Sequence, residues 1–147
     1  MQYDFTTNFY LMNPKTIKTA YWISTCIFAL FALMDGIGGV TRQQAGVDAM
    51  QMLGYPVYFL TISGVAKLLG VASILQTKYK TLKEWAYAGF AFQMLGAFAS
   101  WSFAGGETFN IIFPLIMLAI MCVPYYCWKR YEQLKTKAYF QENIYNK

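Results

Sequence analysis

Four long runs of apolar residues constrain this chain more than any other feature of its sequence. They cover residues 20–40, 57–75, 85–103 and 111–128. An α-helix needs about 20 apolar residues to cross a hydrocarbon core of about 30 Å. Of the 19 charged residues in the chain, only Asp35 and Lys67 lie inside the four runs. Because a helix on the surface of a soluble protein carries a charged face, the pattern predicts four membrane-spanning helices.

The composition agrees with this prediction and excludes several classes of site. Hydrophobic residues make up 57% of the chain and charged residues 13%, whereas soluble domains carry about 25% charged residues. The chain has no histidine, which excludes histidine-ligated metals and a histidine general base. Its three cysteines form no C-x-x-C pair and are predicted to be buried apolar fillers. The sequence therefore shows no evident cofactor motif and no metal site, and we expect contact with a lipid bilayer but not with nucleic acid.

The distribution of basic residues predicts the orientation of the helices. Positively charged residues remain on the cytoplasmic side of a membrane, and the two loops that follow the first and third runs hold only one basic residue, Arg42. We therefore predict one all-α membrane domain over residues 1–147: a four-transmembrane-helix up-down bundle with both termini cytoplasmic and a basic tail at 129–147. The basic residues outside those two loops and the runs are Lys15, Lys18, Lys78, Lys80, Lys83, Lys129, Arg130, Lys135, Lys137 and Lys147.

Three polar side chains lie within the predicted spans at similar depths. Lys67 and Gln93 are each eight residues from the predicted cytoplasmic end of their runs, which corresponds to a depth of about 12 Å. Asp35 is five residues from the opposite end of its run, about 10 Å above the level of Lys67. Because the lysine stem is long, this spacing allows a direct or water-bridged ion pair. Ser63 shares a helix face with Lys67, and Ser100 shares one with Gln93.

These five residues, Asp35, Lys67, Gln93, Ser63 and Ser100, form a candidate intramembrane polar site facing the interior of the bundle. A charge inside hydrocarbon costs on the order of 2.5–3.5 kcal/mol, so such residues normally pair or have a function. One interpretation is an ion pair that locks two helices together. The other is a binding pocket or a group that carries a proton. The residues themselves leave both interpretations open, and for Gln93 a hydrogen bond between helices is the simpler role.

Several local signals predict where helices begin and end. Residues 41–55 are expected to hold a short interfacial helix, with Val47, Met50 and Leu53 facing the bilayer. Residues 81–84 (Thr-Leu-Lys-Glu) have the pattern of a capping box at the start of the third span. The Gly-Gly pair at 105–106 is predicted to end that span. Aromatic residues near the helix ends are expected in two interfacial belts. The cytoplasmic belt comprises Tyr21, Trp22, Tyr79, Trp85, Tyr87, Tyr125, Tyr126 and Trp128, and the outer belt comprises Tyr55, Tyr58 and Trp101.

Four segments together resemble the DoxX family, and most closely its DoxX-like branch. They are residues 31–38, 50–56, 64–70 and 83–90, and the similarity extends from about residue 16 to residue 128. The resemblance implies a four-helix bundle in a bacterial cytoplasmic membrane. It also implies a link to quinone-dependent thiosulfate oxidation, in which named members act as subunits. Many members of the family place a base after the first-helix glycine and an acid in the second helix. Here the acid is Asp35 in the first helix and the base is Lys67 in the second.

Three functional hypotheses follow from the residues and the resemblance. The first is a non-catalytic accessory or assembly subunit, acting with a membrane partner subunit or as a homo-oligomer, which agrees with the lack of catalytic motifs. The second is a redox-linked subunit that binds a quinone, whose carbonyl would accept a hydrogen bond from Lys67 or Gln93. The third is a carrier of small molecules or protons, which the absence of inverted repeats disfavours.

Overall fold

The computed structural model describes the backbone of residues 14–145 and the side chains of residues 15–136. Within that part the chain is all-helical and contains no strand. Its helices are α2 (Pro14–Val40), α3 (Gln44–Met52), α4 (Tyr58–Leu75), α5 (Lys80–Phe103) and α6 (Thr108–Tyr145). The all-α prediction is thus confirmed. The fourth apolar run and the basic segment after it form one continuous helix, α6, of 38 residues.

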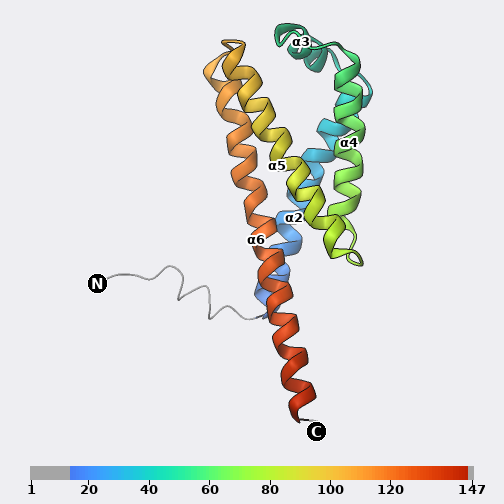
Figure 1. Ribbon diagram of the computed structural model, residues 1–147, viewed down its shortest axis with the longest axis vertical. Coiled ribbons are helices and arrows are strands. Elements are labelled where there is room, and N and C mark those ends of the chain that lie inside the picture. The colour runs from blue at the N-terminus through green and yellow to red at the C-terminus, as the bar shows by residue number, and fades with distance from the viewer. Residues whose placement is uncertain (1–13, 146–147) are drawn as a thin grey trace, which may run out of the picture.

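The four long helices form a bundle in which consecutive helices run in opposite directions (Figure 1). α2 packs against α4 and α6, and α5 packs against the same two helices from the other side. The short helix α3 lies at one end of the bundle, which we call the upper end as drawn in Figure 1. α2 begins and α6 ends toward the opposite, lower end.

Three of the four long helices are long and apolar enough to cross a membrane, judged by length and composition. These candidate spans are Lys15–Val40, Tyr58–Leu75 and Thr108–Thr136. α5 is 24 residues long but is not among them, since Gln93, Ser100 and Ser102 interrupt its apolar sequence. The first, second and fourth predicted spans therefore have counterparts in the structure, and the span at residues 85–103 stays a prediction.

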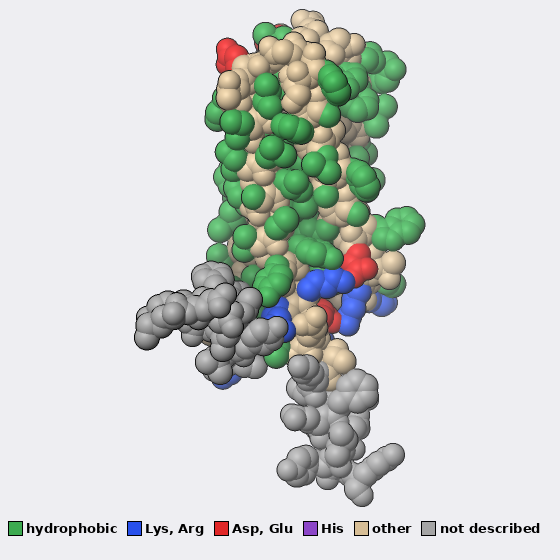
Figure 2. All heavy atoms as spheres, turned by 60° about the vertical axis from the view of Figure 1, so that its left-hand side comes forward, with side chains coloured by type: hydrophobic (Ala, Val, Ile, Leu, Met, Phe, Trp, Pro, Cys, Tyr) green, Lys and Arg blue, Asp and Glu red, His purple; other side chains and the backbone are tan. Residues whose placement is uncertain are grey.

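The surface of the bundle is apolar along much of its length. Figure 2 shows one face, on which hydrophobic side chains extend between the two ends and charged side chains gather toward the lower end. Phe92, for example, is 76% exposed. Ion pairs join Lys80 to Glu132 and Lys129 to Glu84, in both cases between α5 and α6. So much exposed apolar surface is unfavourable in water and compatible with lipid, as expected of a membrane protein.

Glycines bring the backbones of α2 and α4 into direct contact. A Cβ atom added to Gly64 would lie 2.7 Å from the backbone nitrogen of Val40 and 2.8 Å from the carbonyl oxygen of Gly36. A Cβ atom added to Gly39 would lie 3.0 Å from Cα of Gly64. Small residues allow helices to approach closely in a membrane, where packing holds helices together. The α2–α4 contact is therefore specified by these three glycines.

The buried core occupies the lower half of the bundle. Phe28 and Phe90 meet there edge to face, with ring centroids 5.3 Å apart and an interplanar angle of 81°. All four long helices contribute to this core. Its buried members are Tyr21, Phe28, Ala29, Ala32, Val71, Ile74, Tyr87, Phe90, Met121, Cys127 and Trp128.

The predicted end of α5 is confirmed and its predicted start is wrong. Gly105 has a φ of +65°, and the N–H groups of Gly105 and Gly106 donate to the carbonyls of Ser102 and Trp101. This is the hydrogen-bond pattern with which a glycine ends a helix. At the other end, α5 begins at Lys80 without a side-chain cap, so the capping box predicted at residues 81–84 does not form.

The short helix predicted within residues 41–55 is confirmed as α3, but its apolar face has a different role from the one expected. Val47, Met50 and Leu53 are partly buried. Met50 and Leu53 line a cavity within the bundle, so this face does not lie simply on the bilayer. The sequence pattern identified an apolar face but could not tell lipid from the protein's own interior.

Candidate functional site

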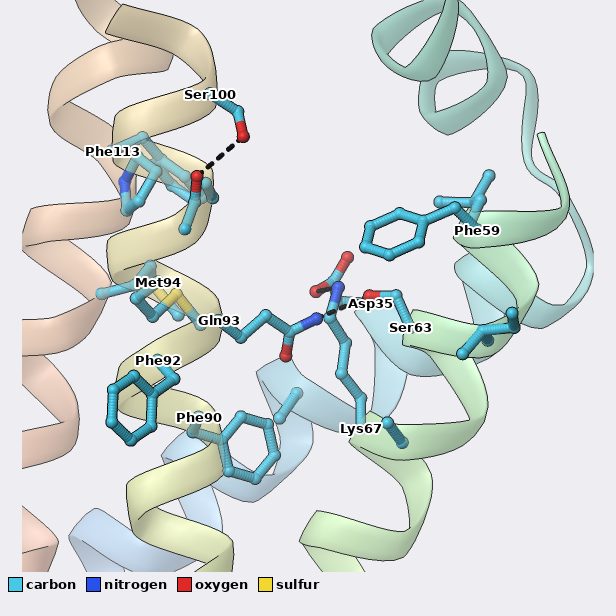
Figure 3. Close-up of a pocket in the computed structure, with 18 of the residues that line it drawn as sticks. Asp35, Phe59, Ser63, Lys67, Phe90, Phe92, Gln93, Met94, Ser100 and Phe113 are labelled. Carbon is cyan, nitrogen blue, oxygen red and sulfur yellow. Dashed lines mark hydrogen bonds and ion pairs between the residues drawn. The ribbon is translucent and has the colours of Figure 1, made fainter. Parts of the chain in front are cut away.

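The upper half of the bundle holds a large cavity that is partly open to the outside. Its volume is about 740 Å³, and residues from all four long helices and from α3 line it. Phe28 and Phe90 contribute to its walls where it meets the buried core. The lining is mostly apolar, and Figure 3 shows the polar side chains that project into it. A cavity of this size falls within the range of about 300–1,000 Å³ typical of small-molecule sites.

Asp35 and Lys67 form an ion pair across the wall of this cavity. Nζ of Lys67 on α4 lies 2.5 Å from Oδ2 of Asp35 on α2. The lysine side chain is 13% exposed and the aspartate side chain 62% exposed. Both residues line the cavity, so the exposed surface of Asp35 includes surface that faces this hollow. The pair thus links α2 to α4 and also presents charge to the cavity.

A hydrogen bond between Gln93 and Ser63 links α5 to α4 close to this ion pair (Figure 3). Nε2 of Gln93 donates to Oγ of Ser63 at 2.6 Å. Ser100, two turns above Gln93 on α5, also lines the cavity. Its Oγ donates to the Gly96 carbonyl at 2.8 Å and lies 3.0 Å from Oη of Tyr55. All five residues of the candidate polar site therefore line the same cavity.

The polar groups on these walls can both donate and accept hydrogen bonds. The ammonium group of Lys67 has three N–H donors and the amide of Gln93 has two. The described polar contacts of the two side chains are the pairs with Asp35 and Ser63. The carboxylate of Asp35 accepts. A carbonyl, a hydroxyl or an amide of a bound molecule would find a partner here, while its apolar parts would contact aromatic and aliphatic side chains.

The sequence did not indicate that Tyr55 and the aromatic side chains line the cavity. Tyr55 follows α3 and reaches Ser100 on α5. Its ring stacks on that of Phe59, with centroids 5.3 Å apart and an interplanar angle of 23°. The sequence predicts Tyr55 only as a member of the outer aromatic belt. No pattern along the chain indicates that a loop tyrosine meets a serine 45 residues later, because this contact depends on how the helices cross.

A second polar cluster, at the lower end, overturns two predictions. Lys83, predicted to lie in a cytoplasmic loop, is 2% exposed. Its Nζ donates to Oη of Tyr21 at 2.7 Å and lies 5.5 Å from the ring centroid of Trp128. Tyr21, Tyr87 and Trp128 are buried and so do not belong to the predicted cytoplasmic belt, whereas Tyr79, Trp85 and Tyr126 of that belt are exposed. Burial lowers the pKa of Lys83 below its ordinary value of 10.5, and the nearby carboxylate of Glu132 opposes that shift.

We predict a pH dependence of stability from Lys83. Between its lowered pKa in the folded protein and 10.5 in the unfolded chain, the unfolded state binds more protons, so the free energy of unfolding rises with pH. Lys83→Met should remove this contribution. The measurement is the melting temperature in detergent from pH ~8 to ~10, below most tyrosine ionisation. Lys78→Met, which changes an exposed loop lysine, should keep the rise; an equal rise in Lys83→Met would contradict the prediction.

The cysteines and acidic residues give no indication of a metal site. Among the described residues, no group of three or more histidine, cysteine, aspartate or glutamate side chains is arranged to hold a metal ion. Cys127 is buried as predicted, whereas Cys26 and Cys122 are exposed. Those two residues belong to the apolar outer surface of α2 and α6 and not to the core.

Comparison with known proteins gives one match. The model of the DoxX-like family matches residues 23–123. This range begins in α2, ends in α6 and contains all five residues of the candidate polar site. No curated protein and no solved structure matches the chain.

Proposed function

The chain belongs to the DoxX-like family, and on that premise we propose that it binds a lipophilic small molecule in the central cavity of a multi-pass bundle. We place it in the inner membrane of a bacterium. In this role it is a non-catalytic accessory or assembly subunit. It holds the small molecule, and a partner in the membrane carries out the reaction. The name of the family gives no ligand, so the ligand class is inferred from the residues that line the cavity.

One observation carries the proposal: five polar residues found within the apolar runs line a single cavity. Asp35, Ser63, Lys67, Gln93 and Ser100 come from three helices and meet around about 740 Å³ of otherwise mostly apolar space. An ion pair whose only role was to hold two helices together would not need a cavity beside it. Apolar walls with a few convergent polar groups are typical of small-molecule sites.

A quinone is the ligand that the DoxX resemblance implies, and the cavity residues fit one. Lys67 and Gln93 would hold a ring carbonyl of the quinone through N–H donors. Asp35 would accept a hydrogen bond from a hydroxyl of its reduced form, the quinol. Aromatic walls such as Phe90 and Phe113 would contact the ring. When bound, a quinone supplies reversible two-electron redox chemistry. The side chains named here bind and orient the ring and exclude water.

The proposal includes residues 85–103 of α5 as the fourth membrane-spanning segment, with both termini cytoplasmic. α5 has 24 residues, a length of about 36 Å, and it packs between α4 and α6. Gln93, which lowers its apolarity, donates to Ser63 and lines the cavity. The basic residues near the start of α5 and in the C-terminal part of α6 support a cytoplasmic lower end.

The test measures binding of a benzoquinone without a side chain to the purified full chain in detergent, by titration calorimetry. The wild type should bind with a measurable heat. Gln93→Leu should weaken binding by about tenfold, since it removes one hydrogen bond to the ring carbonyl. Gln51→Leu makes the same change at an exposed residue of α3 that does not line the cavity and should bind like the wild type.

Absence of binding by the wild type, or equal binding by the two leucine variants, would refute the proposal. A second experiment tests the carrier hypothesis. If the chain in liposomes conducts protons or solutes, and if Lys67→Met abolishes that flux, the cavity is part of a transport pathway and the accessory role is wrong.

A further inference from the structure

A second hollow continues the cavity downward between α4 and α5. It has a volume of about 280 Å³, and it shares Ala66, Phe90 and Gln93 with the cavity above. Its other walls are Leu69, Gly70 and Ser73 of α4 and Leu82, Trp85, Ala86 and Gly89 of α5. We call this second hollow the α4–α5 groove.

The groove and the cavity lie on the same face of each helix. On α4, the cavity is lined at residues 59–60, 62–63 and 66–67 and the groove at 66, 69–70 and 73. On α5, the groove is lined at residues 82, 85–86, 89–90 and 93 and the cavity at 90, 92–94, 96–97 and 100. Steps of three and four residues follow one helix face. The two hollows therefore lie end to end along the α4–α5 seam, with Ala66, Phe90 and Gln93 between them.

The groove has open space at Gly89 and is closely packed at Gly70, where an added Cβ atom would lie 2.7 Å from the ring of Phe90. A Cβ atom added to Gly89 would meet nothing within 4 Å. Leu69 and Trp85 at its walls are 65% and 75% exposed, which places the opening on the apolar outer surface of the bundle. Where small residues bring helices into contact, a Cβ atom has no space, as at Gly64. At Gly89 the space is present without a helix to fill it.

The groove also offers little polarity to an occupant. The hydroxyl of Ser73 donates to the Leu69 carbonyl within α4 at 2.8 Å. Gln93 lies at the junction with the cavity, where its amide donates to Ser63. Below that junction the lining residues are aliphatic, aromatic or glycine apart from Ser73. Because polar groups must be paired when they leave water, this composition favours a hydrocarbon occupant.

From the proposed function, and resting on it, we infer that the α4–α5 groove binds the hydrocarbon chain of the ligand whose polar head lies beside Gln93 and Lys67. The ligand class is then a head group with one long alkyl or isoprenoid chain, entering from the bilayer between α4 and α5. The groove from Ala66 to Ser73 covers eight residues, a rise of about 10 Å over seven steps. It therefore holds the first part of a long chain, and the remainder extends into lipid.

The experiment uses a benzoquinone that carries a decyl chain with a terminal diazirine, added to the full chain in liposomes and photolysed. Mass spectrometry of the labelled peptides should place most of the label on residues 69–73 and 82–89. An excess of the benzoquinone without a side chain should remove this label, because it competes for the head-group site. Labels on the outer faces of α2 and α6, which any chain in lipid would reach, should resist that competition.

Gly89→Phe fills the groove and should reduce the groove label by about tenfold, while calorimetric binding of the benzoquinone without a side chain stays unchanged. Ala88→Phe adds a ring at the preceding residue, which is exposed and lines neither hollow. This variant should be labelled like the wild type. Groove label that resists competition would mean that bulk lipid fills the groove, and label near Met50 or Phe59 would place the chain in the upper cavity. Either result overturns the inference, and loss of head-group binding in the wild type would instead refute the proposed function.

Discussion

Lys67→Met is expected to lower the free energy of unfolding by about 2–3 kcal/mol. The change leaves the carboxylate of Asp35 without the ammonium group that lies 2.5 Å from it. Removal of one partner from an ion pair at low dielectric is strongly destabilising because the remaining charge is uncompensated. The expected loss is smaller than for a fully enclosed pair, since the Asp35 side chain is 62% exposed. The measurement is thermal unfolding in detergent followed by circular dichroism.

The double variant with Lys67→Met and Asp35→Leu separates a structural pair from a binding site. It removes both charges, so much of the lost stability should return. Benzoquinone binding should stay weak, because the ammonium donor is absent. Lys18→Met, which changes an exposed lysine of α2, controls for general effects of charge. Restored stability together with wild-type binding would show that the pair only joins α2 to α4.

Gly64→Ala is expected to cost about 2–3 kcal/mol, and Gly64→Leu is expected to prevent folding. The new Cβ atom would lie under 3.0 Å from backbone atoms of Val40, Gly36 and Gly39. Backbone atoms of a packed helix pair cannot move aside as a flexible side chain can, so the last turn of α2 would have to separate from α4. Thermal unfolding of the purified variant measures the cost.

Gly96→Ala is the matched control for Gly64→Ala. Both glycines lie inside helices, but a Cβ atom on Gly96 would meet nothing within 4 Å. Alanine has a higher helix propensity than glycine by up to about 1 kcal/mol, so this variant should be neutral or slightly more stable. If the two alanine variants had equal stability, the close approach of α2 and α4 would not be what holds them together.

The helices themselves could be predicted because each depends on local sequence. An apolar run long enough for a span predicts a helix wherever it lies in the chain, and the glycine at position 105 ends α5 through its own backbone preference. The capping box at 81–84 was wrong because a better local arrangement competes with it. The amide of Gln76 accepts from the backbone N–H of Tyr79 and donates to its carbonyl, and α5 then begins at Lys80.

The candidate site could be predicted only in its polar members. Asp35, Lys67 and Gln93 are conspicuous because charged and amide groups are costly inside apolar runs. The aromatic and aliphatic walls of the cavity have no such signal, since Phe59 or Phe113 looks like any other residue of an apolar run. Lys83 shows the reverse error: it looked like other lysines near a helix start, yet its stem and ammonium lie among Tyr21 and Trp128.

The sequence alone determined that this chain forms apolar helices and which few side chains such helices cannot easily bury in lipid. Both follow from the cost of placing a residue in hydrocarbon, which depends on the residue and its neighbours along the chain. Only the tertiary structure decided that the lower half of the bundle is filled and the upper half hollow. That difference comes from where α2 and α4 touch at Gly64 and where α5 stands away from α2, and such crossings depend on contacts between residues far apart in the chain.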